Sequence, residues 1–198
     1  MPKAQRPIYY LCQMTPEQAI SILKKYYPED GIAFNYLYQH SMAVAQLAVQ
    51  IATKHPELHP DIPFVHTSAL LHDIGIFMTN APVIGCHGQL PYIAHGYLGR
   101  EILEKEGYPE HALVCERHVG VGISKEDVIT HKLPLPARDM VPQSTEEEIV
   151  CYADKYFSKN AGKLFTPKSP EKILKKLEKH GADKPEIFRR FMEKYGLP

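Results

Sequence analysis

The feature that most constrains this chain is a histidine followed directly by an aspartate at the end of an apolar helical run. Residues 64–71 (FVHTSALL) lead into His72 and Asp73, and Ile74 and Gly75 follow at once. Burying an imidazole beside a carboxylate is unfavourable unless both polar groups find partners. A metal ion would satisfy the two side chains together, so this position predicts a metal site inside a folded core.

Apolar residues recur at helical spacing along nearly the whole chain. Thr15, Pro16 and Gln18 predict the N-cap, first-turn proline and capping box of a helix that runs to about Tyr27. Thr145 is expected to begin a second capping box. Gly75 is expected to stop a helix, as glycine often does. No alternating strand pattern of useful length is present, which predicts an all-α fold of seven to nine helices. The helices other than the first are expected over about 35–53, 63–73, 91–106, 109–118, 145–159, 169–181 and 183–196, with a short one from 124.

Composition narrows the class of protein. Lys and Arg number 23, as do Asp and Glu, so the formal charge is zero and binding of a nucleic acid polymer through bulk basicity is not expected. No apolar stretch approaches the roughly 18 residues that span a bilayer, so no membrane partner is expected. The four cysteines form no CxxC pair, which favours reduced thiols and a cytoplasmic protein.

Four more candidate metal ligands lie in similar helical settings. His40 falls in register with inward-facing apolar residues, His95 is expected early in a helix, His118 at the end of one, and Asp154 on a core-facing side. With His72 and Asp73 they make six candidate ligands, whereas a single catalytic zinc ion usually takes three from the protein. Two ions account for six ligands better than one. Imidazole with carboxylate favours Fe, Mn, Co, Ni or Zn over Mg or Ca.

The sequence resembles the HD-domain superfamily of metal-dependent phosphohydrolases, and in particular its HDIG subset, because residues 72–75 spell His-Asp-Ile-Gly. The resemblance runs from about residue 36 to 159. It implies a helical bundle with a central metal site, forming a single domain over 1–198 with its core at about 34–160 and the helices of 168–198 packed as an appendage. It also implies two metal ions, with Fe or Mn favoured and Zn, Co or Ni as alternatives. One ion would be held by His40, His72, Asp73 and Asp154, and the other by His95 and His118. Asp73 would bridge the two ions as the catalytic residue.

The reaction expected from this resemblance is hydrolysis of a phosphate ester or anhydride by a metal-bound hydroxide. The substrate would be a nucleotide or another small phosphorylated metabolite, and the protein a monomer or homodimer. Cationic groups near the ligands in the sequence are candidate phosphate contacts: Lys155, Arg117, Arg138 and His87. His66 is expected to be structural or exposed. His111 shares a helical stripe with His118 and is expected to be structural.

Other functions stay open at this stage. Some proteins of the HD fold hold a di-iron centre with the same six ligands and act as oxygenases, and a non-catalytic metal- or nucleotide-binding module is a further alternative. The resemblance extends to enzymes that split symmetrical dinucleoside polyphosphates. It does not extend to cyclic-di-GMP phosphodiesterases, because Ile76 stands where that branch has lysine, or to (p)ppGpp hydrolases, whose charged signature is missing.

Overall fold

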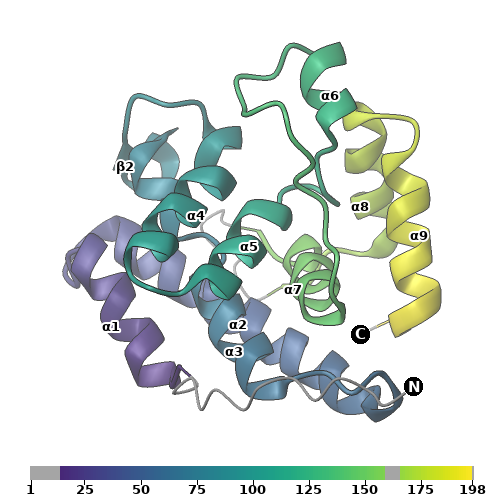
Figure 1. The fold of residues 1–198 in the computed structure, drawn as a ribbon, viewed down its shortest axis with the longest axis horizontal. Coiled ribbons are helices and arrows are strands. Elements are labelled where there is room, and N and C mark those ends of the chain that lie inside the picture. The colour runs from purple at the N-terminus through teal and green to yellow at the C-terminus, as the bar shows by residue number, and fades with distance from the viewer. Residues whose placement is uncertain (1–13, 159–165, 198) are drawn as a thin grey trace, which may run out of the picture.

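Helices carry most of the chain in the computed structural model, which describes residues 14–158 and 166–197 (Figure 1). The expected all-α class is confirmed. Two strands of two residues each, β1 (Asn80–Ala81) and β2 (Cys86–His87), form an antiparallel hairpin that the sequence pattern did not predict. The nine α-helices of the described ranges are α1 (Pro16–Tyr26), α2 (Ile32–Lys54), α3 (Ile62–Leu71), α4 (His95–Lys105), α5 (Pro109–Arg117), α6 (Lys125–Thr130), α7 (Thr145–Tyr156), α8 (Pro170–Leu177) and α9 (Lys184–Tyr195).

Capping side chains set where several helices begin. The predicted capping box of α1 is confirmed, since the Thr15 side chain accepts from the Gln18 N–H and the Gln18 side chain accepts from the Thr15 N–H. The predicted cap of α7 at Thr145 is wrong by one residue. Ser144 has extended backbone angles and its hydroxyl accepts from the Glu147 N–H, so Ser144 is the N-cap and Thr145 is the first helical residue.

The core lies where four helices meet. Helices α2, α3, α5 and α7 pack against one another, α1 covers α3, and α4 packs on α5. The C-terminal pair α8 and α9 lies at the right of Figure 1 and packs on α7, where the Tyr152 ring contacts Phe188 and Tyr195. The main cluster of buried apolar residues runs from Met14 in front of α1 to Tyr195 in α9, and a second, smaller cluster of Ile123, Val128 and Met140 lies at α6.

The segment after His72 and Asp73 is fixed from two sides. It is a 3₁₀ turn, Ile74–Met78, and the buried Tyr27 hydroxyl donates to the Ile74 carbonyl while accepting from the Phe77 N–H. Gly75 lies inside this turn, so the prediction that it stops a helix is wrong. A Cβ on Gly75 would lie only 2.3 Å from the His95 carbonyl oxygen. The glycine therefore allows the backbones of α4 and the 3₁₀ turn to touch.

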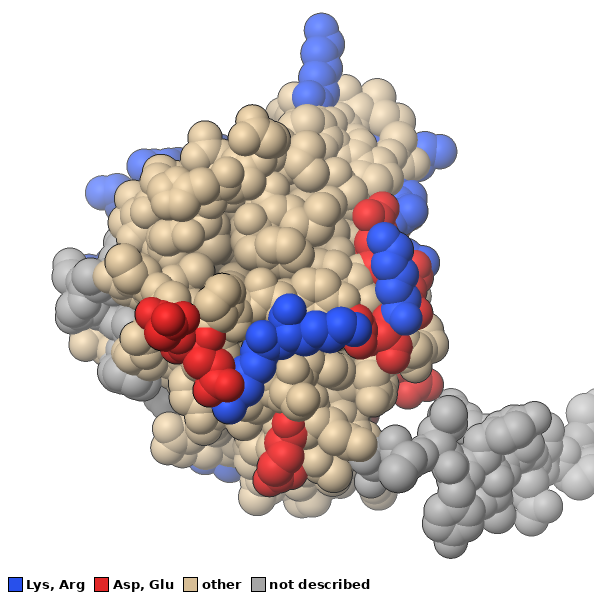
Figure 2. All heavy atoms as spheres, turned by 90° about the vertical axis from the view of Figure 1, so that its left-hand side faces the viewer, with Lys and Arg blue, Asp and Glu red and all other residues tan. Residues whose placement is uncertain are grey.

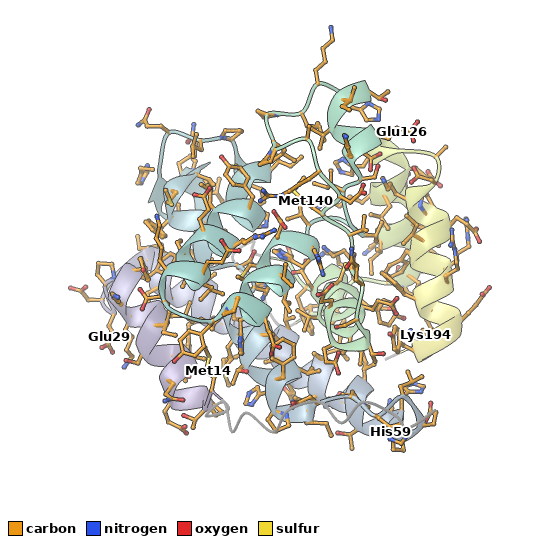
Figure 3. The ribbon with its side chains drawn as sticks, viewed as in Figure 1. Met14, Glu29, His59, Glu126, Met140 and Lys194 are labelled. Atoms are coloured by element: carbon orange, nitrogen blue, oxygen red, sulfur yellow. The ribbon has the colours of Figure 1, made fainter. Side chains whose placement is uncertain are left out.

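Charged side chains are distributed unevenly over the face that α1, α2 and the hairpin form (Figure 2). Figure 2 shows the side formed by the N-terminal helices and the hairpin, where acidic and basic side chains form a band across the lower half and along the right edge, and the upper part is largely uncharged. In Figure 3, Glu126 and Lys194 point outward, whereas Met140 of the proline-rich connection lies inside against the buried Ile123 and Val128. Within 14–158 and 166–197, every helix is too short or too polar to cross a lipid bilayer.

His111 makes the stability of the fold depend on pH. It is 7 % exposed between α3 and α5, its Nε2 lies 2.9 Å from the Thr67 hydroxyl, and its ring packs on Phe64. Burial lowers the pKa of His111 to about 4, and Asp61 opposes this only weakly. An unfolded histidine has a pKa of about 6.5, so between these values the unfolded chain binds a proton that the folded chain excludes.

The free energy of unfolding should therefore fall as the pH drops from about 6.5 to about 4, with His111 contributing up to roughly 3 kcal/mol of the loss. We expect His111→Gln to flatten this dependence relative to the wild type. Urea unfolding of both metal-free proteins at a series of pH values measures it, since titration of all other groups is common to the pair. Parallel curves for the two proteins would contradict the assignment.

Candidate metal centre

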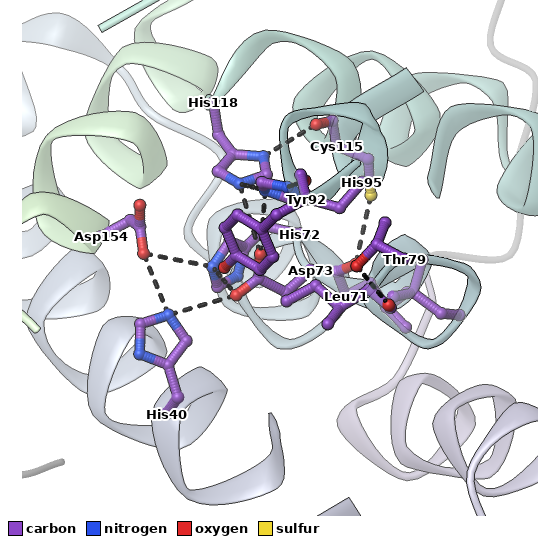
Figure 4. A network of polar contacts seen from close by, with 12 residues as sticks. His40, Leu71, His72, Asp73, Thr79, Tyr92, His95, Cys115, His118 and Asp154 are labelled. Atoms are coloured by element: carbon purple, nitrogen blue, oxygen red, sulfur yellow. Dashed lines mark hydrogen bonds and ion pairs between the residues drawn. The ribbon is translucent and has the colours of Figure 1, made fainter. Parts of the chain in front are cut away.

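Six side chains predicted from the sequence converge at one buried place, although five different elements carry them. The members come from the middle of α2, the end of α3, the first residue of α4, the residue after α5 and the last turn of α7 (Figure 4). Every one of them is buried. They are His40, His72, Asp73, His95, His118 and Asp154.

The first group contains two imidazoles and two carboxylates. His40 Nε2 lies 3.0 Å from Asp154 Oδ1 and 3.3 Å from Asp73 Oδ2. His72 Nε2 lies 3.1 Å from the same Asp73 oxygen and 3.5 Å from the same Asp154 oxygen. One ligand atom from each of the four residues lies within 4.8 Å of all the others, which is a set that could hold a metal ion.

The second group shares Asp73 with the first. Its other oxygen, Oδ1, lies 3.4 Å from His95 Nε2 and 3.5 Å from His118 Nε2. These two imidazole nitrogens are 3.2 Å apart, and the three residues again form a set that could hold an ion. Asp73 therefore directs one oxygen to each group, which is the arrangement of a carboxylate that bridges two metal ions.

Backbone carbonyls fix which ring nitrogen faces the centre. The Nδ1 atoms of His72, His95 and His118 lie 2.7, 2.6 and 2.8 Å from the carbonyl oxygens of the residues three positions earlier. A carbonyl oxygen only accepts, so each Nδ1 carries the hydrogen, and in the neutral ring Nε2 presents a lone pair. Metal-binding histidines are oriented in this way. Three lone pairs directed at two buried carboxylates fit a cation at the centre.

The charges of the cluster also favour a cation at its centre. Asp73 is 0 % exposed, and an isolated carboxylate in that position would be strongly unfavourable. Burial lowers the pKa of His72, but the carboxylates of Asp73 and Asp154 outweigh it and raise the pKa to about 9. Burial lowers the pKa of His118, which Asp73 opposes only in part. The two carboxylates thus favour positive charge beside them.

The predicted phosphate contacts lie in different settings. Lys155 Nζ pairs with Asp154 Oδ2 at 2.6 Å, at the edge of the cluster. Arg117 pairs with Glu147 at 2.7 Å, and Arg138 pairs with the carboxylate of Glu116. His87 is an exposed residue of β2. The structure does not bring these four groups together around the cluster, and their contact with substrate stays a prediction.

Two contributors to the site were missed by reasoning from the sequence. The Tyr92 ring packs on His95 with centroids 4.7 Å apart, and its carbonyl accepts from that histidine. Glu116 is 2 % exposed and lies between Arg100 and Arg138, where it ties α4 and the connection between α6 and α7 to α5, the helix that His118 follows. The only signal for Glu116 in the sequence was that a glutamate lies on the buried stripe of a predicted helix. His66 and His111 lie outside both ligand groups.

Comparison with known proteins identifies the family and the fold. The family model of the HD domain matches residues 37–158. The chain belongs to the HD-domain family. An uncharacterised protein of Methanocaldococcus jannaschii is 37 % identical over 87 % of this chain and 90 % of its own. The crystal structure of the HD domain of the L. monocytogenes phosphodiesterase PgpH shares the fold at 18 % identity, with a TM-score of 0.50 over 88 % of this chain and 94 % of that one.

Two longer relatives match only in part. The tRNA (cytidine(56)-2'-O)-methyltransferase of Thermoplasma volcanium is 38 % identical over 64 % of this chain, and that of Picrophilus torridus is 35 % identical over 72 %. The matched regions make up 33 % and 36 % of those proteins, so the chain spans about a third of their length. Their methyltransferase activity is therefore not transferred to this chain.

Gly75 should control the second ligand group. A Cβ there would meet the backbone of His95 and Gly99, and so would push His95 away from Asp73. We expect Gly75→Ala to lower the bound Mn²⁺ from about two ions to about one and to destabilise the fold by about 1–3 kcal/mol. Metal analysis after equilibrium dialysis measures the stoichiometry.

Gly107→Ala is the matched control, because a Cβ at Gly107 meets nothing within 4 Å although its φ of 88° strains any L side chain. This variant should lose stability but keep its metal content. Equal stoichiometry in Gly75→Ala and the wild type would show that the close approach does not hold His95 in place.

Proposed function

We propose that this protein is a metal-dependent phosphohydrolase that acts on a nucleotide or another small phosphorylated metabolite. The observation that carries the proposal is the position of Asp73, whose two oxygens face two separate groups of imidazoles. Four imidazoles with two carboxylates suit Fe or Mn, or alternatively Zn, Co or Ni, better than Mg or Ca. Membership of the HD-domain family supports the same chemistry.

The residues of the chain would divide the work as follows. His40, His72 and Asp154 would hold one ion, His95 and His118 the other, and Asp73 would bridge both as the catalytic carboxylate. A pair of divalent ions supplies a water of lowered pKa and neutralises charge that develops on phosphoryl oxygens. The backbone carbonyls keep the lone pairs of His72, His95 and His118 turned inward. Burial of the cluster excludes bulk water and strengthens each of these interactions.

The comparisons help to narrow the substrate. In two tRNA methyltransferases a region similar to this chain is part of a longer enzyme that modifies a nucleic acid, which favours a nucleotide over a sugar phosphate. The L. monocytogenes domain of the same fold is named a phosphodiesterase, so phosphodiesters belong among the compounds to be tested. We propose a single domain that works as a monomer or homodimer in the cytoplasm.

A metal and substrate screen tests the proposed function. Protein purified without chelators or affinity metal should contain Fe or Mn at about two ions per chain. It should release phosphate from one class of nucleotide or sugar phosphate, or product from a chromophoric phosphodiester, equally well with and without oxygen. Turnover that requires both iron and oxygen, with no phosphate released, would instead identify an oxygenase of the same ligand set.

Asp73→Ala should abolish both metal binding and turnover, because it removes the one ligand that the two groups share. We expect a loss of activity of at least about 10²–10³-fold and a metal content near zero by elemental analysis. His66→Ala is the control on α3, the helix that leads to Asp73, since His66 is half-buried and outside both groups. This control should keep both properties. Full activity in Asp73→Ala would refute the proposed mechanism.

A further inference from the structure

Lys155 holds the side of Asp154 that faces away from the imidazoles. Its Nζ lies 2.6 Å from Asp154 Oδ2, and the Lys155 side chain is only 12 % exposed. The other carboxylate oxygen, Oδ1, is the one near His40 and His72, at 3.0 and 3.5 Å. The ammonium group therefore occupies one oxygen of Asp154 and leaves the other for the centre, which favours a ligand that binds a metal through a single oxygen.

The same ammonium group also reaches the second ligand group. Lys155 Nζ donates to the carbonyl oxygen of His118 at 3.2 Å. Asp154 belongs to the first group and His118 to the second, and the two residues lie 36 positions apart on α7 and after α5. The Cys151 thiol, one turn before Lys155, lies 3.4 Å from the same carbonyl oxygen. One largely buried cation thus contacts the side chain of a residue in the first group and the backbone of a residue in the second.

Charge balance assigns the lysine a role besides geometry. Asp73 and Asp154 bring two negative charges into a buried place, and an unpaired buried charge is strongly unfavourable. Lys155 is a short-range positive partner for one of them. A hydrogen-bonded cation beside a ligating carboxylate fixes the orientation of that ligand, and loss of such a partner typically lowers metal affinity 10–100-fold.

We infer that Lys155 is a positioning residue, which holds the Asp154 carboxylate and the backbone after α5 in the orientation that metal binding needs. This is its main role, rather than contact with a phosphate group of the substrate. The inference rests on the proposed metal pair but not on any particular reaction. A lysine that bound substrate phosphate would act on KM and leave metal affinity alone. A lysine that positions Asp154 acts on metal affinity in the absence of substrate.

A calorimetric titration of the metal-free protein with Mn²⁺ distinguishes a lysine that positions Asp154 from a lysine that binds substrate phosphate. Lys155→Met keeps an unbranched side chain, one atom shorter, and removes the charge, and we expect its Mn²⁺ affinity to fall about 10–100-fold. Lys155→Arg retains a cation that can pair with Asp154 and should recover most of the affinity. Lys172→Met, which removes a charge from an exposed position on α8, should bind Mn²⁺ as the wild type does.

Kinetics at saturating Mn²⁺ complete the test. Lys155→Met should then show a KM within about twofold of the wild type. Unchanged Mn²⁺ affinity together with a raised KM would overturn the inference and make Lys155 a phosphate contact. If circular dichroism shows that Lys155→Met is unfolded, Lys155→Gln replaces it, and wild-type Mn²⁺ affinity in that variant would also overturn the inference. Because the titration needs no substrate, it gives its answer even if the protein proves not to be a phosphohydrolase.

Discussion

The rest of the site depends on one buried carboxylate. Asp73 is closed to solvent, and each of its oxygens lies near imidazole nitrogens. A carboxylate buried in this way is tolerated only where positive charge or hydrogen-bond donors surround it. The four histidines therefore have to be considered together with Asp73, because cations at the centre would satisfy their inward-facing nitrogens and its two oxygens at once, and Asp73 gives the two groups a common member.

Helix ends supply the orientation that the site needs. His72 and His118 directly follow α3 and α5. Their Nδ1–H groups donate to carbonyl oxygens in the last turns of these helices, those of Ala69 and Cys115. Carbonyls at a helix C-terminus lack partners within the helix. The same hydrogen bond thus satisfies an unpaired carbonyl and fixes the ring with its Nε2 lone pair toward the centre. This explains why the histidine at each of these two places ends a helix and does not lie within one.

The sequence predicted the helices and the six candidate ligands for a common reason, since each depends on residue types at regular spacing within its own segment. What it could not predict depends on contacts between distant segments. Gly75 was interpreted as a helix stop, yet its role is set by the backbone of His95. The partners of Arg117 and Arg138, which are Glu147 and Glu116, were equally hidden, because a charged side chain carries no local sign of what it pairs with. The cap of α7 was displaced by one residue because Ser144 and Thr145 are both good caps.

The apolar core and the polar cluster have separate tasks. Fully buried aromatic and aliphatic side chains, among them Tyr152, Phe188 and Leu70, extend from α1 to α9 and bury enough apolar surface to support the fold. A small metal domain whose folding depends on its ion has no such core. Here the core holds five elements in place around the cluster, and the lysine beside Asp154 offsets part of its negative charge. A scaffold of this kind places the side chains of a site on rigid elements that the apolar core holds, which is what a precise metal centre requires.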